Sequence, residues 1–206
     1  MKWCLGNFSA YSFYGAAWTV EQLVTAAGVA GYAGVGLADA GGVWGGVGLS
    51  QACDRAGLRM VLGARVKLRD FAPEWLQITV RDRRGYAALC ELLSGTQDGE
   101  AEWEDVERLQ AKAAGHLWLS CPVRAGRGGN GRIGPFARWR SGWERLAEVD
   151  RDNLWLELGW VNAEERLLQR RVFGEWRRHG WERWVLMSGA RHAGGEAGPR
   201  RLEVLQ

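Results

Sequence analysis

Few side chains in this sequence could hold a catalytic metal. It contains three histidines, His116, His179 and His192, and no pair of cysteines at the CxxC spacing of a zinc site. Metal-dependent hydrolysis needs His, Asp, Glu and Cys side chains in number around each ion. A polynuclear metal site therefore has few ligands available in this chain.

The ends of the predicted strands carry mostly small or apolar residues. Functional groups of α/β folds gather at the carboxyl ends of strands, so catalytic side chains would be expected there. Asp39 follows the second predicted strand, Cys121 ends a later one, and residues 188–192 follow the last. This pattern offers little acid–base or metal chemistry.

Arginines gather in one Gly-rich stretch in the second half of the chain, with Phe136 and Trp139 between them. Arginines and aromatic rings on a flexible loop can hold phosphates and stack bases, which would make this a DNA-binding segment. The alternative is a solvated loop without a ligand. The arginines are Arg124, Arg127, Arg132, Arg138 and Arg140.

Hydrophobic periodicity indicates strands that alternate with helices along the whole chain. Residues 19–30, for example, have apolar side chains at helical spacing behind a capping box of Thr19 and Gln22. About seven strand–helix units favour an α/β fold with mainly parallel strands, arranged as an incomplete barrel rather than a doubly wound sheet. The predicted strands are 4–8, 32–37, 58–62 with 65–68, 75–80, 116–121, 153–158 and 184–187, and the predicted helices are 19–30, 45–56, 85–94, 103–113, 143–149 and 163–179.

The composition is that of a globular protein with a sizeable core. The chain has 206 residues, of which 47% are hydrophobic and 25% charged, and this balance excludes a disordered chain. Its length suits a single domain over 1–206, with a Gly/Arg-rich loop at about 124–134 and a weakly structured tail at about 193–206. Without a signal-like apolar run, a membrane-spanning stretch or a disulfide framework, a cytoplasmic protein is expected.

Several segments resemble the PHP (polymerase and histidinol phosphatase) domain, and most closely the one that opens bacterial DNA polymerase III alpha subunits and error-prone DNA polymerases. Residues 8–24, 35–45 and 56–63 are similar to its first three segments. Residues 83–94 are similar to its more specific E-G-Y-R-N-L-C-x-L-L-S pattern. The resemblance covers nearly the whole chain and implies a distorted (β/α)7-type barrel.

Most metal ligands of that family have no counterpart in this chain. Residues 6–8, Gly-Asn-Phe, stand where the family has H-x-H, Ala40 and Trp75 replace histidines, and Arg65 replaces a glutamate. The ligands that the resemblance leaves are Asp39, Cys121 and His192.

Arg65 puts a fixed positive charge into a site that binds cations in the family, and Phe8 and Trp75 would fill the volume of the metals. We therefore expect a packed or ligand-free pocket and no cofactor. In that case Asp39 caps a helix or turn, Cys121 is a core residue and His192 lies in a surface loop. The alternative is one residual divalent metal, such as zinc or manganese, on those three side chains.

The resemblance implies a place in DNA replication or repair. The leading hypothesis is a non-catalytic stand-alone domain, a structural or interaction module that docks with a DNA polymerase or a repair protein. One alternative is a metal-dependent phosphoesterase or 3′–5′ exonuclease with a remodelled site. Another is a DNA-binding accessory protein that uses the Arg-rich loop, and a last one is a folded fragment of a polymerase gene without a role.

Two features could reflect a new binding function rather than the loss of the family's metal site. Arg65 could hold a phosphate by its charge. The 13 tryptophans could include exposed anchors for a partner protein, for which Trp176 and Trp181 around His179 are candidates. The alternative for these rings is ordinary core packing.

Overall fold

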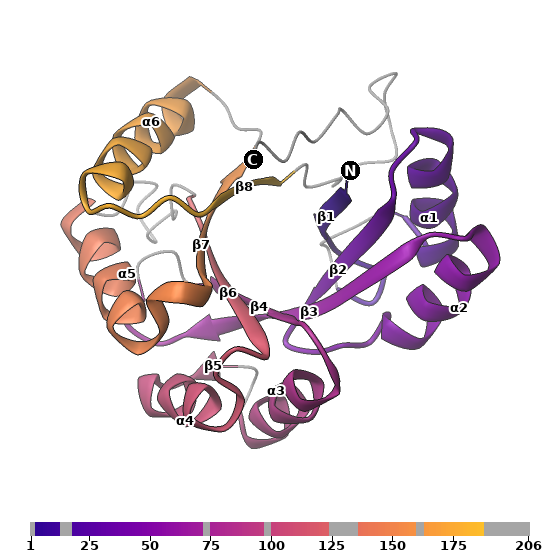
Figure 1. The fold of residues 1–206 in the computed structure, drawn as a ribbon, viewed down its shortest axis with the longest axis horizontal. Helices are drawn as coiled ribbons and strands as arrows, with labels where there is room; N and C mark the ends of the chain where they lie inside the picture. The colour runs from indigo at the N-terminus through magenta and orange to yellow at the C-terminus, as the bar shows by residue number, and fades with distance from the viewer. Residues whose placement is uncertain are drawn as a thin grey trace.

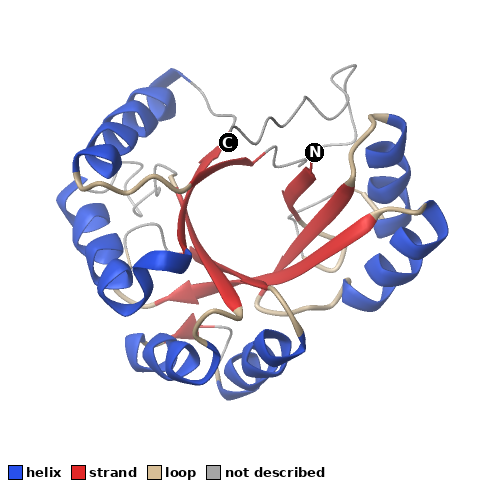
Figure 2. Cartoon of the chain, in the orientation of Figure 1, coloured by secondary structure: helices blue, strands red, loops and turns tan. Residues whose placement is uncertain are grey.

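The computed structural model describes residues 3–12, 18–71, 75–96, 100–123, 136–159 and 163–187. Within these ranges, eight strands form one curled sheet, and the helices lie on its outer side (Figures 1 and 2). Neighbouring strands follow the order β1-β2-β3-β4-β6-β7-β8, and the short β5 pairs with β3. The strands are β1 (Trp3–Asn7), β2 (Gly34–Ala40), β3 (Arg59–Leu68), β4 (Trp75–Val80), β5 (Glu100–Ala101), β6 (Leu117–Pro122), β7 (Leu154–Gly159) and β8 (Trp184–Met187).

The helices connect these strands and cover the sheet from outside (Figure 1). Among the described residues, no helix is both long and apolar enough to cross a membrane. The helices are α1 (Val20–Val29), α2 (Gly46–Ala56), α3 (Arg83–Gly95), α4 (Trp103–Ala113), α5 (Phe136–Asp150) and α6 (Ala163–Arg178), with a 3-10 turn, η1, at Arg151–Asn153.

The sheet is parallel except at β4, which runs antiparallel to both β3 and β6. All other strands therefore direct their carboxyl ends to one end of the curled sheet, and β4 begins at that end. No strand pairing joins β1 to β8 within the described ranges. The predicted α/β fold with mainly parallel strands in an incomplete barrel is confirmed.

Local sequence signals set several helix ends as predicted. Gln22 donates its backbone N–H to Thr19 Oγ1 at 3.3 Å, and Thr19 donates its own to Gln22 Oε1 at 2.9 Å, which is the expected capping box. At the end of α2, Gly57 takes a left-handed conformation with φ of 65°, which a residue without a side chain adopts at little cost.

The third strand passes through a glycine. Residues 65–68 were expected to extend the strand predicted at 58–62 beyond Gly63, and β3 runs from Arg59 to Leu68 through this glycine without a break. A Cβ atom at Gly63 would lie 2.4 Å from the backbone oxygen of Ile78. The glycine therefore permits the close approach of β4 rather than ending the strand.

Two further elements differ from what the sequence pattern indicated. Helix α5 begins at Phe136, seven residues before the predicted start at 143, so Arg138 and Arg140 lie on a helix and not in the Gly-rich stretch. The short strand β5 was not predicted, because two residues carry no periodic pattern.

The core lies between the sheet and the helices. One cluster of buried side chains packs β1, β2 and the first part of β3 against α1 and α2, and a larger one packs the rest of β3 and the following strands against α3–α6. Side chains alternate along each strand, so Leu76 and Ile78 join the core while Gln77 and Thr79 face the inside of the curl. The helix-packed face of β4 is thus apolar, whereas its inner face carries polar side chains.

Candidate functional site

Asp39 lies at the end of β2 on the face that packs against the helices. It shares that face with Val35 and Leu37, whose side chains belong to the core under α1 and α2. Its side chain is 1% exposed. It therefore points away from the inside of the curl, where Arg65 lies.

Every oxygen of Asp39 is occupied by hydrogen bonds from two loops. Oδ1 accepts from Ser9 N and Ser12 Oγ, both at 2.7 Å, and Oδ2 accepts from Ser9 Oγ at 2.8 Å and Gly45 N at 3.0 Å. Four donors fill most of the acceptor capacity of one carboxylate. Asp39 is thus a cap that ties the loop after β1 to the start of α2.

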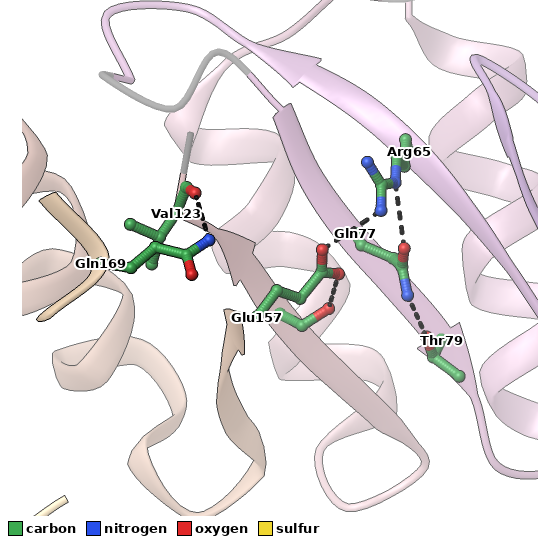
Figure 3. Close-up of polar contacts among 7 residues, drawn as sticks. Arg65, Gln77, Thr79, Val123, Glu157 and Gln169 are labelled. Carbon is green, nitrogen blue, oxygen red and sulfur yellow. Dashed lines mark hydrogen bonds and ion pairs between the residues drawn. The ribbon is translucent and has the colours of Figure 1, made fainter. Parts of the chain in front are cut away.

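Arg65 and Glu157 form a buried ion pair inside the curl (Figure 3). The guanidinium Nη2 lies 3.1 Å from Glu157 Oε2, and the two side chains are 5% and 3% exposed. The pair connects β3 with β7, which are separated in the sheet by β4 and β6. Each charge neutralises the other, so neither is a free cation for a phosphate nor a free base.

Uncharged side chains complete this network. Arg65 Nε donates to Gln77 Oε1 at 3.0 Å, and Ser120 Oγ donates to Glu157 Oε1 at 2.7 Å. Gln77 Nε2 lies 3.4 Å from Thr79 Oγ1, a long contact at the edge of the network (Figure 3). The network spans β3, β4, β6 and β7, as the pairing of Arg65 with Gln77 and of Gln77 with Ser120 requires.

An aromatic ring covers Arg65 from the loop side. The guanidinium carbon lies 4.7 Å from the centre of the Phe8 ring, which is 9% exposed. A desolvated cation over a ring face is favoured by the ring quadrupole. Trp75 opens β4 opposite Lys67 and is half-buried.

Of the three residues left by the family resemblance, the structure describes two, and both Asp39 and Cys121 face the helices. Cys121 is fully buried in the core under the helices, and burial, followed by the nearby charge of Glu157, raises the pKa of its thiol well above the ordinary value. A thiol in this state is a poor metal ligand. His192 lies outside the described residues. Among the residues that are described, no cluster of three or more His, Cys, Asp or Glu side chains could hold a metal.

The predicted DNA-binding segment falls largely outside the described part of the chain. Arg124, Arg127 and Arg132 lie there, and the side chain of Arg138 does too. Arg140 is on α5, where its Nε donates to Glu144 Oε1 at 2.8 Å. This one described arginine side chain of the set is therefore paired within its own helix.

The candidate partner surface at Trp176 and Trp181 is an aromatic cluster. Trp143 stacks on Trp176 with ring centres 5.0 Å apart, and Trp181 meets Trp143 edge-on at 4.6 Å. Trp176 is 1% exposed, so it cannot touch a partner of the folded chain. Trp181 is half-buried, with His179 stacked on it at 5.1 Å, and it is the one tryptophan of this cluster that keeps accessible surface.

Sequence reasoning named Arg65 but missed its partners. Gln77, Ser120 and Glu157 are polar residues within otherwise apolar strands, all on the inner face of the sheet. Such interruptions were the available signal, since buried polar residues require partners. Pairing between strands far apart in the chain could not be read from spacing.

Comparison with known proteins agrees with this fold. The family model described as PHP domain matches residues 7–158. The error-prone DNA polymerase of Anaeromyxobacter dehalogenans strain 2CP-C is 36% identical over 95 residues, 45% of this chain and 8% of that protein. The error-prone DNA polymerase of Anaeromyxobacter sp. strain K is 33% identical over 108 residues, 51% of this chain and 10% of that protein. The chain thus spans a tenth or less of these curated relatives.

Two solved structures share the architecture. A proposed metal-dependent phosphoesterase from Bifidobacterium adolescentis superimposes with a TM-score of 0.62 and 14% identity, over 97% of this chain and 91% of that one. An amidohydrolase from Chromobacterium violaceum, with bound sulfate and no metal, gives a TM-score of 0.65 and 14% identity, over 100% and 92%. At this identity the likeness establishes the fold and nothing finer.

Proposed function

This chain belongs to the PHP domain family, and on that premise we propose that it is a non-catalytic member, a structural or interaction module associated with a DNA polymerase or with DNA repair machinery. The observation that carries the proposal is the buried Arg65–Glu157 ion pair. It occupies the end of the curled sheet at which the resemblance to the family places metal ligands.

The ion pair argues against a metal in two ways. A divalent ion about 4 Å from the guanidinium of Arg65 would be repelled by about 8 kcal/mol at the effective dielectric of a partly buried site. Glu157 could serve as a ligand only by leaving Arg65 without a counter-charge, which is costly in a buried position. Catalysis by metal-activated water is therefore disfavoured at this end of the sheet.

The ion pair instead stabilises the sheet. It bridges strands from the two halves of the sheet, together with Gln77 and Ser120. A metal cluster held by several strands could fasten a barrel in the same way. In this chain, protein groups would provide that connection, and the fold would be independent of metal.

The association with a polymerase rests on the curated relatives, both of which are error-prone DNA polymerases. Trp181 has a half-buried ring that stacks on His179. Tryptophan is enriched among the residues that anchor protein interfaces. Phosphoesterase activity is the competing proposal, and the fold shared with the Bifidobacterium protein is what favours it.

Metal content and turnover test the two proposals against each other. We would purify the chain without chelator, measure bound metal by elemental analysis, and assay p-nitrophenyl phosphate and single-stranded DNA with manganese or zinc. The expected result is far less than one ion per chain and no turnover above the buffer. A stoichiometric metal, with turnover that a chelator removes, would overturn the non-catalytic proposal.

Association is tested separately. The purified chain and the purified error-prone polymerase of the same organism would be mixed and examined by sedimentation velocity. A common species is expected, weakened by Trp181→Ala and unchanged by Tyr86→Ala on the exposed side of α3. Independent sedimentation of the two proteins would contradict the polymerase association.

A further inference from the structure

We propose that the inside of the curled sheet is a binding site for a small aromatic anion, one or two fused rings with an acidic group. A cavity of about 280 Å³ lies there. Its lining does not include Phe8, Arg65 or Glu157, so it lies beneath the ion-pair network and apart from the end where the family resemblance places metals. The proposal is independent of the proposed function.

Indole rings make up much of the cavity wall. Trp3, Trp118 and Trp155 come from the starts of β1, β6 and β7, and all three are half-buried. Trp118 and Trp155 meet edge-to-face with ring centres 6.4 Å apart. Rings arranged in this way present flat apolar surfaces on which another aromatic ring can stack.

The ring of Trp3 is held in place before any ligand binds. A Cβ atom at Gly34 would lie 2.4 Å from this ring, so the ring rests directly on the glycine of the neighbouring strand. The guanidinium of Arg59 lies 5.4 Å from the ring centre. A wall fixed by its neighbours loses little conformational entropy when a ligand binds.

The inner end of the cavity is polar. Gln77 and Ser120 line it and are 3% and 5% exposed. The Ser120 hydroxyl donates a hydrogen bond to Glu157, and its oxygen can still accept one. The Gln77 amide makes a long contact with Thr79 through one N–H, and its second N–H can donate to a ligand. A ligand with a ring nitrogen or hydroxyl at that end would be oriented by these groups.

Positive charge lies at the indole walls. The guanidinium carbon of Arg81 is 5.3 Å from the centre of Trp118, and the group also donates to the backbone oxygen of Gly115 at 2.8 Å. The guanidinium carbon of Arg59 likewise lies 5.4 Å from the centre of the Trp3 ring. The carboxylate of Asp82, the residue after Arg81, lies 2.6 Å from His116 Nδ1. Neither arginine is among the residues that line the cavity, so their charges act across the indole rings, where they favour an anionic ligand over a cationic one.

The volume sets the size of the ligand. An apolar cavity of roughly 150 Å³ holds benzene, and pockets for larger ligands begin at roughly 300 Å³. A space of about 280 Å³ therefore suits a bicyclic ring system.

Calorimetry with 2-naphthoate tests the proposal on the whole chain. We expect one site per chain and binding about tenfold tighter than that of 2-naphthylmethylammonium, which matches it in shape and carries the opposite charge. Val61→Trp, which fills the cavity, should abolish binding, and Val29→Trp, an 88% exposed position, should not. The Arg59→Gln/Arg81→Gln double variant should bind but lose most of the charge preference.

Two outcomes would overturn the proposal: no saturable binding of 2-naphthoate, or binding that persists unchanged in a folded Val61→Trp variant. If far-UV circular dichroism finds that variant unfolded, Val61→Phe replaces it. The unmodified chain provides a check that needs no variant, since a ligand of the folded state must raise the unfolding midpoint as its concentration increases. A midpoint that does not move would contradict the proposal.

Discussion

The two ends of the curled sheet differ in how their inner side chains are packed. At the carboxyl end of the strands, Arg65, Glu157 and Asp39 all have partners within the chain. Nearer the start of the strands, tryptophans surround unfilled space. A buried charge must be paired within the chain because an unpaired one costs several kcal/mol, whereas an apolar surface carries no hydrogen-bonding group that needs a partner. The polar end therefore had to be completed by side chains, while the apolar end could stay open.

Breaking the ion pair should have the largest effect. Glu157→Ala leaves Arg65 buried without a counter-charge, and we expect the free energy of unfolding to fall by about 3–5 kcal/mol. Denaturation by urea, followed by circular dichroism, measures it.

Two variants control that experiment. Glu107→Ala removes the exposed partner of Arg145 and should cost less than about 1 kcal/mol. The double variant Arg65→Met/Glu157→Leu removes both charges and should recover most of the loss. Equal effects of Glu157→Ala and Glu107→Ala would mean that the buried pair is not the support described above.

Asp39→Asn should come next, at about 2–3 kcal/mol. The amide keeps one oxygen but turns a nitrogen donor toward Ser9 Oγ and Gly45 N, which are themselves donors to that position. Chemical denaturation gives the value, and hydrogen exchange at Gly45 should rise with it. A neutral result would refute the role of Asp39 as a loop cap.

Two matched substitutions on β3 compare the open and the filled face of the sheet. Val66 is 1% exposed against the helices, so Val66→Phe should overpack the core at a cost of about 1–3 kcal/mol. Val61 lines the cavity, so Val61→Phe should change stability by less than about 1 kcal/mol. Equal costs at the two positions, measured by urea unfolding, would indicate that the cavity does not accept a ring.

The smallest effect is expected from an exposed pair near the start of the strands. The hydrogen bond from His116, followed by that from the backbone of Gly85, lowers the pKa of Asp82. Its stabilising contribution is therefore present above the unfolded pKa of about 3.9 and is lost as the pH falls through the lower folded value. The unfolding midpoint of His116→Gln should accordingly depend less on pH in the acid range, and a steeper dependence would contradict this assignment.

Most of the fold was predictable from local patterns. The capping box at Thr19 and the glycine end of α2 act within one helical turn, and the structure places both as predicted. The errors arose where tertiary contacts decide. Helix α5 extends to Phe136 in a stretch that composition alone marked as loop. The extension of β3 beyond Gly63 was expected, but only the structure shows that the glycine permits the close approach of β4.

The candidate site was only partly predictable. The resemblance to the family placed Arg65 at the position of a glutamate, and the sequence contains few histidines that could bind a metal. That Glu157 neutralises Arg65 was not predictable, because the two residues are 92 positions apart and lie on strands that are not neighbours. Nor could spacing reveal that Asp39 and Cys121 face the helices, away from the inside of the sheet.

The sequence by itself determined the order of most strands and helices, the class of fold and the small number of histidines available as metal ligands, since propensity, capping and residue type act locally. Only the tertiary structure decided the antiparallel course of β4, the partner of each buried charge and the cavity among Trp3, Trp118 and Trp155. These depend on which strands lie side by side and which face each residue occupies. Both depend on packing energies summed over the whole sheet, and the sequence of a single segment does not determine that sum.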